Sequence, residues 1–66
     1  MKRKFNMSLH TKLIEQDLRQ KDLGAMVRIH QSTVSAIMHG ILIPSERVKL
    51  KIAKALGSSV EEVFKD

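Results

Sequence analysis

The chain has 66 residues, a formal net charge of +5 and no cysteine. This length lies near the lower limit at which one hydrophobic core sustains a fold, so we expect a single domain over residues 1–66. Without cysteine there is no thiolate metal site and no thiol catalysis, and aromatic residues at 3% provide no stacking platform for single-stranded bases. The basic surplus suits a polyanionic partner.

Three basic side chains, Lys2, Arg3 and Lys4, open the chain without any apolar periodicity. We expect residues 1–5 to form a flexible basic tail. This tail is either a solvated terminus, the interpretation that we favour, or an arm that lies along nucleic-acid phosphates or in a groove. No apolar run of signal-peptide length follows, and no stretch approaches the ~20 apolar residues that span a bilayer. A cytoplasmic protein is therefore expected.

The first helix is predicted over residues 8–16, with Asn6 or Ser8 as its N-cap. Its expected inward side chains are Leu9, Leu13 and Ile14. A short turn at Asp17 and Leu18 then leads to the next helix.

Two short helices that meet across a fixed turn are predicted over residues 20–27 and 31–39. Apolar residues three and four apart give each helix a buried face, at Leu23, Met26 and Val27 in the first and at Val34, Ile37 and Met38 in the second. The opposite face of the second helix is small and polar, with Gln31, Ser32, Ser35, Ala36 and His39. Gly24 costs about 1 kcal/mol relative to alanine inside a helix, so it predicts the close approach of another backbone, most simply that of the second helix.

Gly40 is expected to end the second of these helices, and three consecutive aliphatic residues follow it at Ile41, Leu42 and Ile43. Such a run in a loop needs cover. Either two of the three side chains fold back onto the core, or the loop forms a subunit interface.

A fourth helix is predicted over residues 46–56, after Pro44 and with Ser45 as its N-cap. Its buried stripe is Val48, Ile52, Ala53 and Leu56. Ser58 or Ser59 caps a short fifth helix, whose inward side chains are Val60, Val63 and Phe64. The sequence thus predicts an all-α protein of five helices.

As a joint pattern, these motifs resemble the helix-turn-helix of the lambda-repressor-like, Cro-type family of DNA-binding transcriptional regulators. The matching positions are Gln20, Leu23, Gly24, Ile29, Val34, Ile37, Gly40, Pro44 and the IAKALG stretch at residues 52–57. The likeness covers about residues 9–64, and it implies a compact five-helix domain with its helix-turn-helix at the second and third helices.

Three positions depart from the family pattern. Arg28 stands in the turn where the family usually has glycine, and a non-glycine residue in a left-handed conformation costs roughly 1 kcal/mol. His30 replaces the usual serine or threonine before the second motif helix, which predicts a weaker cap. Lys49 replaces an apolar residue, so its stem is expected to run out from the edge of the core.

The resemblance assigns DNA base contacts to Gln31, Ser32 and Ala36, whereas without it Gln31 and Ser32 would be an ordinary solvated face. Gln20, at a helix start that favours anions, is a candidate phosphate contact, and in the resembled family this glutamine also supports the one that corresponds to Gln31. The weaker phosphate candidates are Arg19, Thr33, Ser35 and His39. The candidate dimer interface is Ile41, Leu42, Ile43 and Leu50, and the competing one lies around Val63 and Phe64.

We expect a sequence-specific regulator of double-stranded DNA, a homodimeric repressor of phage or plasmid type that binds an inverted-repeat operator. The alternative is an antitoxin or another protein-interaction module with the same fold. An enzyme is not expected, because the chain is small and its carboxylates and histidines show no pairing with a nucleophile. Neither a cofactor nor a metal is expected, since His10, His30 and His39 lack ligand spacing.

Overall fold

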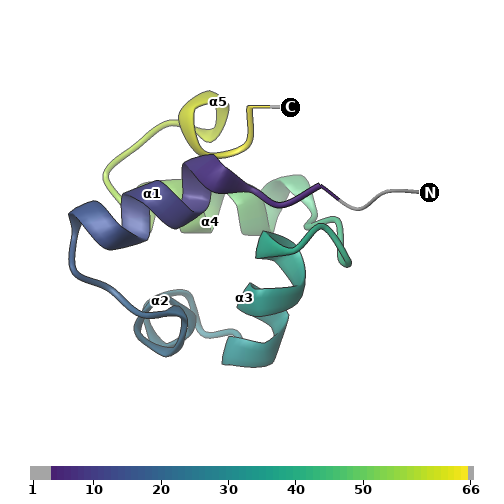
Figure 1. The fold of residues 1–66 in the computed structure, drawn as a ribbon, viewed down its shortest axis with the longest axis horizontal. Helices are drawn as coiled ribbons and strands as arrows, with labels where there is room; N and C mark the ends of the chain where they lie inside the picture. The colour runs from purple at the N-terminus through teal and green to yellow at the C-terminus, as the bar shows by residue number, and fades with distance from the viewer. Residues whose placement is uncertain (1–3, 66) are drawn as a thin grey trace.

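In a computed structural model, residues 4–65 form five helices joined by short turns and loops. The helices are α1 (Met7–Glu15), α2 (Gln20–Val27), α3 (Gln31–Met38), α4 (Glu46–Ala55) and α5 (Val60–Val63). In Figure 1, α1 is drawn in front of α4, with α5 above these two helices and α2 and α3 below them. The all-α five-helix fold class is therefore confirmed.

The observed helix bounds lie within one residue of the predicted bounds for α1 to α4. α1 starts at Met7 because Asn6 rather than Ser8 is its N-cap, and Asn6 Oδ1 accepts a hydrogen bond of 3.0 Å from the Leu9 backbone N–H. His39 and Leu56, predicted as the last residues of their helices, are instead the C-caps of α3 and α4. Differences of this size are common at frayed helix ends.

Eleven apolar side chains from all five helices and the residue after α4 make up the core. They are Leu9, Leu13, Leu23, Val27, Val34, Ile37, Met38, Ile52, Ala53, Leu56 and Val63. The predicted inward positions of Ile14 and Met26 are wrong, because these side chains are 64% and 51% exposed. Each is the neighbour of a buried residue, Leu13 or Val27, and so points about 100° away from it around the helix.

Gly24 lies where α2 meets the turn that follows it and the start of α3. A Cβ atom at Gly24 would lie 2.5 Å from the carbonyl oxygen of Ile29 and 3.4 Å from the backbone nitrogen of Gln31. The predicted close approach of a second backbone is confirmed, although the nearest atom belongs to the turn and only the next one to α3. A side chain here would therefore separate the two helices.

Arg28 closes α2 in the left-handed conformation, with φ 62° and ψ 44°. In this conformation the backbone N–H groups of Arg28 and Ile29 both donate to the Gly24 carbonyl oxygen, the second at 2.9 Å. These bonds satisfy a carbonyl at the helix end and turn the chain sharply into α3. Arg28 thus adopts a positive φ at the position where the family usually has glycine.

Asn6 connects three helices. Besides capping α1, it donates its backbone N–H to Met38 O of α3 at 2.7 Å and its Nδ2 to Val63 O of α5 at 2.9 Å. The side chain is half-buried, so these bonds are partly shielded from water. The segment before α1 is therefore fixed to the ends of two distant helices.

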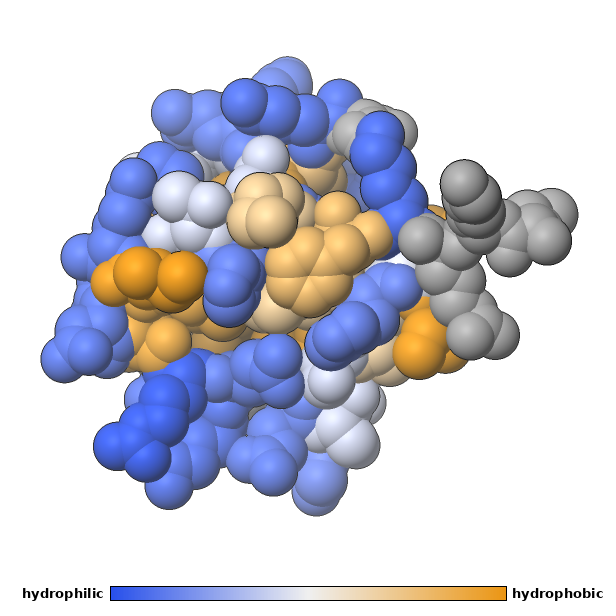
Figure 2. Space-filling model, viewed as in Figure 1, coloured by the Kyte–Doolittle hydropathy of each residue, from blue (hydrophilic) through white to orange (hydrophobic). Residues whose placement is uncertain are grey.

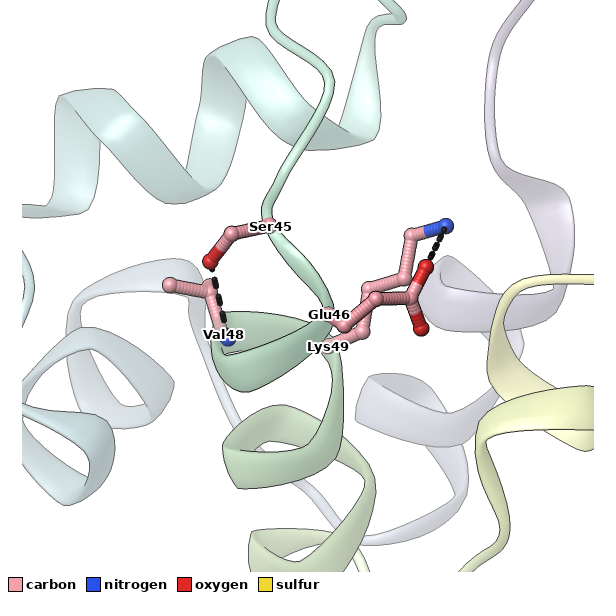
Figure 3. A network of polar contacts seen from close by, with 4 residues as sticks. All are labelled: Ser45, Glu46, Val48 and Lys49. Carbon is pink, nitrogen blue, oxygen red and sulfur yellow. Dashed lines mark hydrogen bonds and ion pairs between the residues drawn. The ribbon is translucent and has the colours of Figure 1, made fainter.

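The start of α4 is held by a serine cap and an ion pair. Ser45 Oγ accepts a hydrogen bond of 3.3 Å from the Val48 backbone N–H, and Lys49 Nζ lies 3.7 Å from Glu46 Oε2 (Figure 3). Lys49 Nζ also lies 5.8 Å from the centre of the Phe64 ring. The half-buried Lys49 thus runs its stem along the edge of the core and its charge outward, as predicted.

Ser59 caps the short helix α5. The Ser59 backbone N–H donates to Glu62 Oε1 at 2.9 Å, and the Glu62 N–H donates to Ser59 Oγ at 3.2 Å. The bond from Ser59 N–H, with the charge of Lys12 nearby, holds the pKa of Glu62 below its ordinary value of 4.5. Of the two serines predicted as the cap, Ser59 is the one that acts.

The close approach at Gly24 leads to a first prediction. Gly24→Ala should lower the free energy of unfolding by about 1–3 kcal/mol, because its Cβ would overlap the Ile29 carbonyl oxygen although alanine favours a helix. Urea denaturation followed by circular dichroism measures the change. Ala25→Gly, at the exposed neighbouring position, should cost only the ~1 kcal/mol of helix propensity. A Gly24→Ala protein more stable than the parent would contradict the packing described here.

The conformation of Arg28 leads to a second prediction. Arg28→Gly should raise the free energy of unfolding by about 1 kcal/mol, because glycine adopts positive φ without steric cost. Arg28→Ala is the matched control, since it removes the same side chain and keeps the backbone strain. Equal stability of the glycine and alanine variants in urea would show that the left-handed turn carries no strain.

Candidate nucleic-acid interface

The polar face of α3 is open to solvent. Gln31, Ser32 and His39 are exposed, while Thr33, Ser35 and Ala36 are half-buried. The opposite face buries Val34, Ile37 and Met38 in the core. In Figure 1, α3 stands at the margin of the fold.

The three predicted base-contacting residues lie together on this face. Gln31 and Ser32 occupy the first turn of α3, and Ala36 follows one turn later. An amide and a hydroxyl in a first turn, with a methyl group behind them, match the groups that read base edges in the major groove. The fold thus places the predicted residues on one face of α3.

His30 caps the N-terminus of α3 through its ring. Nδ1 accepts a hydrogen bond of 3.0 Å from the Ser32 backbone N–H, and the same nitrogen lies 2.8 Å from Ser32 Oγ. The sequence predicted a weaker cap because histidine is uncommon at this position. The structure shows that the imidazole supplies the acceptor that serine or threonine would otherwise provide.

The far end of α3 carries His39. Its Nδ1 lies 2.9 Å from the Ser35 carbonyl oxygen, which can only accept, so Nδ1 donates in this bond. The His39 ring meets the Phe5 ring edge to face, with 5.2 Å between their centres. His39 is therefore held against the protein while its outer edge faces solvent.

Arg19 and Gln20 stand at the start of α2. The Arg19 backbone N–H donates to Asp22 Oδ2 at 2.9 Å, so a carboxylate already offsets part of the positive charge of this helix end. Gln20 Nε2 donates to Met38 Sδ at 3.6 Å, and among the described residues no hydrogen bond joins Gln20 to Gln31. Gln20 thus braces the start of α2 against the end of α3 rather than supporting Gln31.

The segment before α1 runs beside the end of α3. A Cβ atom at Gly40, where φ is 75°, would lie 2.5 Å from Lys4 O, and the Phe5 ring also meets that of His10 at 5.4 Å. Lys4 and Phe5, which the sequence placed in the tail, are therefore packed against the domain. Lys2 and Arg3 lie outside the described residues.

The aliphatic loop after α3 does not fold back onto the core. Ile41, Leu42 and Ile43 are 59%, 44% and 85% exposed, and Leu50 of α4 is 49% exposed. The alternative in which two of the loop side chains join the core is thus wrong, because both Ile41 and Ile43 are more than half exposed. Val63, part of the competing interface, is fully buried.

An open groove of about 310 Å³ lies between the loop, the start of α1 and the end of the chain. Its apolar lining comes from Phe5, Met7, Ile37, Leu42, Ile43, Pro44 and Phe64. Figure 2 shows apolar surface in a band across the middle of the face in view, with polar residues above and below it. None of these apolar side chains takes part in the base-reading or phosphate-binding roles.

Residues 4–65 hold neither a cluster of metal ligands nor a membrane-spanning helix. No three histidine, aspartate or glutamate side chains in this range gather as a ligand set. None of the helices there is long and apolar enough to cross a bilayer.

Two short helices fixed at a left-handed turn, the second with its polar face open, define a helix-turn-helix domain. The family model described as Helix-turn-helix (HTH_3) matches residues 9–63. The chain therefore belongs to the Cro-type helix-turn-helix transcriptional regulators, the family that its sequence resembles.

Two relatives agree with this family. An uncharacterized HTH-type transcriptional regulator of Bacillus subtilis, YgzD, is 42% identical over 45 residues, which is 68% of each chain. A second, MJ0272 of Methanocaldococcus jannaschii, is 33% identical over 63 residues, which is 96% of this chain and 86% of the relative. No solved structure gives a significant match.

Proposed function

We propose that this regulator binds double-stranded DNA sequence-specifically, as a homodimer on an inverted-repeat operator, and that it represses by occlusion in the manner of small phage-type or plasmid-type regulators. The observation that supports this most directly is the exposed first turn of α3, with Gln31 and Ser32 at its surface. Residues 1–66 act as one DNA-binding domain in the cytoplasm. The function involves no cofactor and no catalytic step.

In this proposal α3 enters the major groove with its first turn toward the bases. Gln31 bonds an adenine through N6 and N7, the Ala36 methyl group contacts a thymine methyl, and Ser32 bonds a base edge between them. The exposure of Gln31 and Ser32 supports these contacts, because neither side chain must leave the core to reach DNA. The short turn at Arg28 fixes the angle at which α3 meets the groove.

Phosphate contacts fix the register on the duplex without reading sequence. In the proposal they come from Arg19, Gln20, Thr33, Ser35 and His39, and from a basic arm of Lys2, Arg3 and Lys4. Lys4 packs beside Gly40, close to the end of the recognition helix. This position supports the arm, because it places one of the basic residues next to that helix. The Asp22 carboxylate at the start of α2 makes Arg19 and Gln20 the weakest members of this set.

The dimer forms through the loop of Ile41, Leu42 and Ile43 together with Leu50. One recognition helix reads only a few base pairs, whereas two helices about 34 Å apart read successive major grooves. The exposed loop supports this interface, because apolar surface left in water forfeits about 25 cal/mol per Å². The burial of Val63 inside the subunit counts against the competing interface around Val63 and Phe64.

A second candidate function is that of an antitoxin or another protein-interaction module. The apolar groove beside the loop favours it, because a partner protein could cover the same surface as a second subunit. Co-purification of a tightly bound second protein would distinguish the two functions.

Selection of bound duplexes from a random library tests the proposal, followed by titration of Gln31→Ala on the best site. This variant should lose about 1–3 kcal/mol of binding free energy and relax the preference at one base pair of each half-site. Lys2→Ala is the control, since loss of a phosphate contact weakens all sequences alike and reduces the salt dependence. If Gln31→Ala binds every sequence as the parent does, α3 is not the recognition helix or Gln31 points elsewhere.

Leu42→Glu tests the dimer. It should lower the dimer fraction in sedimentation and weaken full-site binding, because two buried glutamates would face each other across the twofold axis. The helical circular dichroism should persist, since Leu42 is 44% exposed in the subunit. Ile14→Glu, at an exposed aliphatic residue of α1 that does not line the groove, is the matched control. A Leu42→Glu protein that stays dimeric would move the interface away from this loop.

A further inference from the structure

We propose that His30 determines which chemical group Ser32 recognises on DNA. By accepting the hydrogen of the Ser32 hydroxyl, the imidazole leaves Ser32 Oγ only lone pairs for the major groove. Ser32 then selects an exocyclic amino group, N6 of adenine or N4 of cytosine. The inference rests on the proposed function, and it adds a positioning residue that does not itself touch a base.

The protonation of the ring follows from one hydrogen bond. The Ser32 backbone N–H lies 3.0 Å from His30 Nδ1, and a backbone N–H can only donate. Nδ1 must therefore carry a lone pair, and in the neutral ring the hydrogen is on Nε2. The hydrogen bond that caps α3 therefore also determines which ring nitrogen carries the hydrogen.

The orientation of the Ser32 hydroxyl follows next. Ser32 Oγ lies 2.8 Å from this same Nδ1, a normal hydrogen-bond distance. Two facing lone pairs would repel at that distance, so the hydroxyl hydrogen points at Nδ1. The hydroxyl, which usually rotates to suit its partner, is here directed into the protein.

A directed hydroxyl reads fewer bases than a free one. A free serine hydroxyl contacts either kind of base edge, because it donates to guanine and thymine acceptors and accepts from adenine and cytosine amino groups. With its hydrogen committed to His30, Ser32 Oγ can only accept. Ser32 is exposed in the first turn of α3, so its lone pairs are available to a base in the groove.

The test begins with the parent protein at pH 8. The parent and Ser32→Ala are titrated on variants of the selected site, each changed at one base pair. The base pair that Ser32 reads is the one at which Ser32→Ala no longer discriminates. At that position, purine replaces adenine, or pyrimidin-2-one replaces cytosine, so that only the amino group is removed. This change should lower the parent's affinity about threefold to tenfold, the worth of one hydrogen bond, and leave that of Ser32→Ala unchanged.

A second arm changes the histidine. His30→Ala should reduce the discrimination between the preferred base pair and the same pair inverted, because the freed hydroxyl can donate or accept. His30→Asn should retain it, since a side-chain oxygen at the N-cap can accept from both the Ser32 N–H and its hydroxyl. Thermal melting by circular dichroism of both variants shows whether α3 remains folded.

Several results would overturn the inference while leaving the proposed function in place. One is a Ser32→Ala protein whose discrimination is unchanged at every base pair. Another is an amino deletion that does not alter the affinity of the parent. The third is a base-pair preference that survives in His30→Ala or is lost equally in His30→Asn. If the parent selects no sequence at all from the random library, the proposed function fails and this inference falls with it.

Discussion

The backbone contact at Gly24 is the constraint on which the interface depends. With no Cβ in the way, the Ile29 carbonyl comes within contact distance of α2, and the turn closes in the few residues between α2 and α3. The left-handed Arg28 and the paired bonds to the Gly24 carbonyl follow from that short path. The position of the α3 polar face is therefore set by backbone atoms rather than by the side chains that it exposes.

Local pattern predicted the parts of this protein that depend on neighbours along the chain. Apolar spacing located all five helices, and glycine at residue 24 indicated the close backbone approach. The same spacing failed at Ile14 and Met26, where apolar residues stand beside buried ones and the periodic pattern cannot say which of two neighbours faces inward. Periodicity shows which side of a helix is apolar, but the helices packed against that side determine how many of its apolar residues are buried.

The contacts that sequence reasoning missed join residues far apart in the chain. The sequence predicts Gly40 as a helix end, but nothing in the sequence indicates that Lys4 packs against this glycine. The Gln20 amide was assigned to phosphate or to Gln31, whereas it meets the sulfur of Met38. At His30 the residue type predicts a weak cap, because serine and threonine are the usual N-caps. The residue type alone does not indicate that the imidazole nitrogen reaches the Ser32 backbone N–H.

Asn6 has a consequence for the order in which the molecule forms. Its bond to Val63 joins residues 57 positions apart, so it closes almost the whole chain into one loop. Closing such a long loop costs chain entropy before the contact contributes any stabilisation, so contacts of this kind form late in folding. The bond from Ile29 to Gly24 joins residues only five positions apart, so α2 and α3 can meet early. The pair α2 and α3 thus meets across a short loop, whereas the bond between Asn6 and Val63 closes a long one.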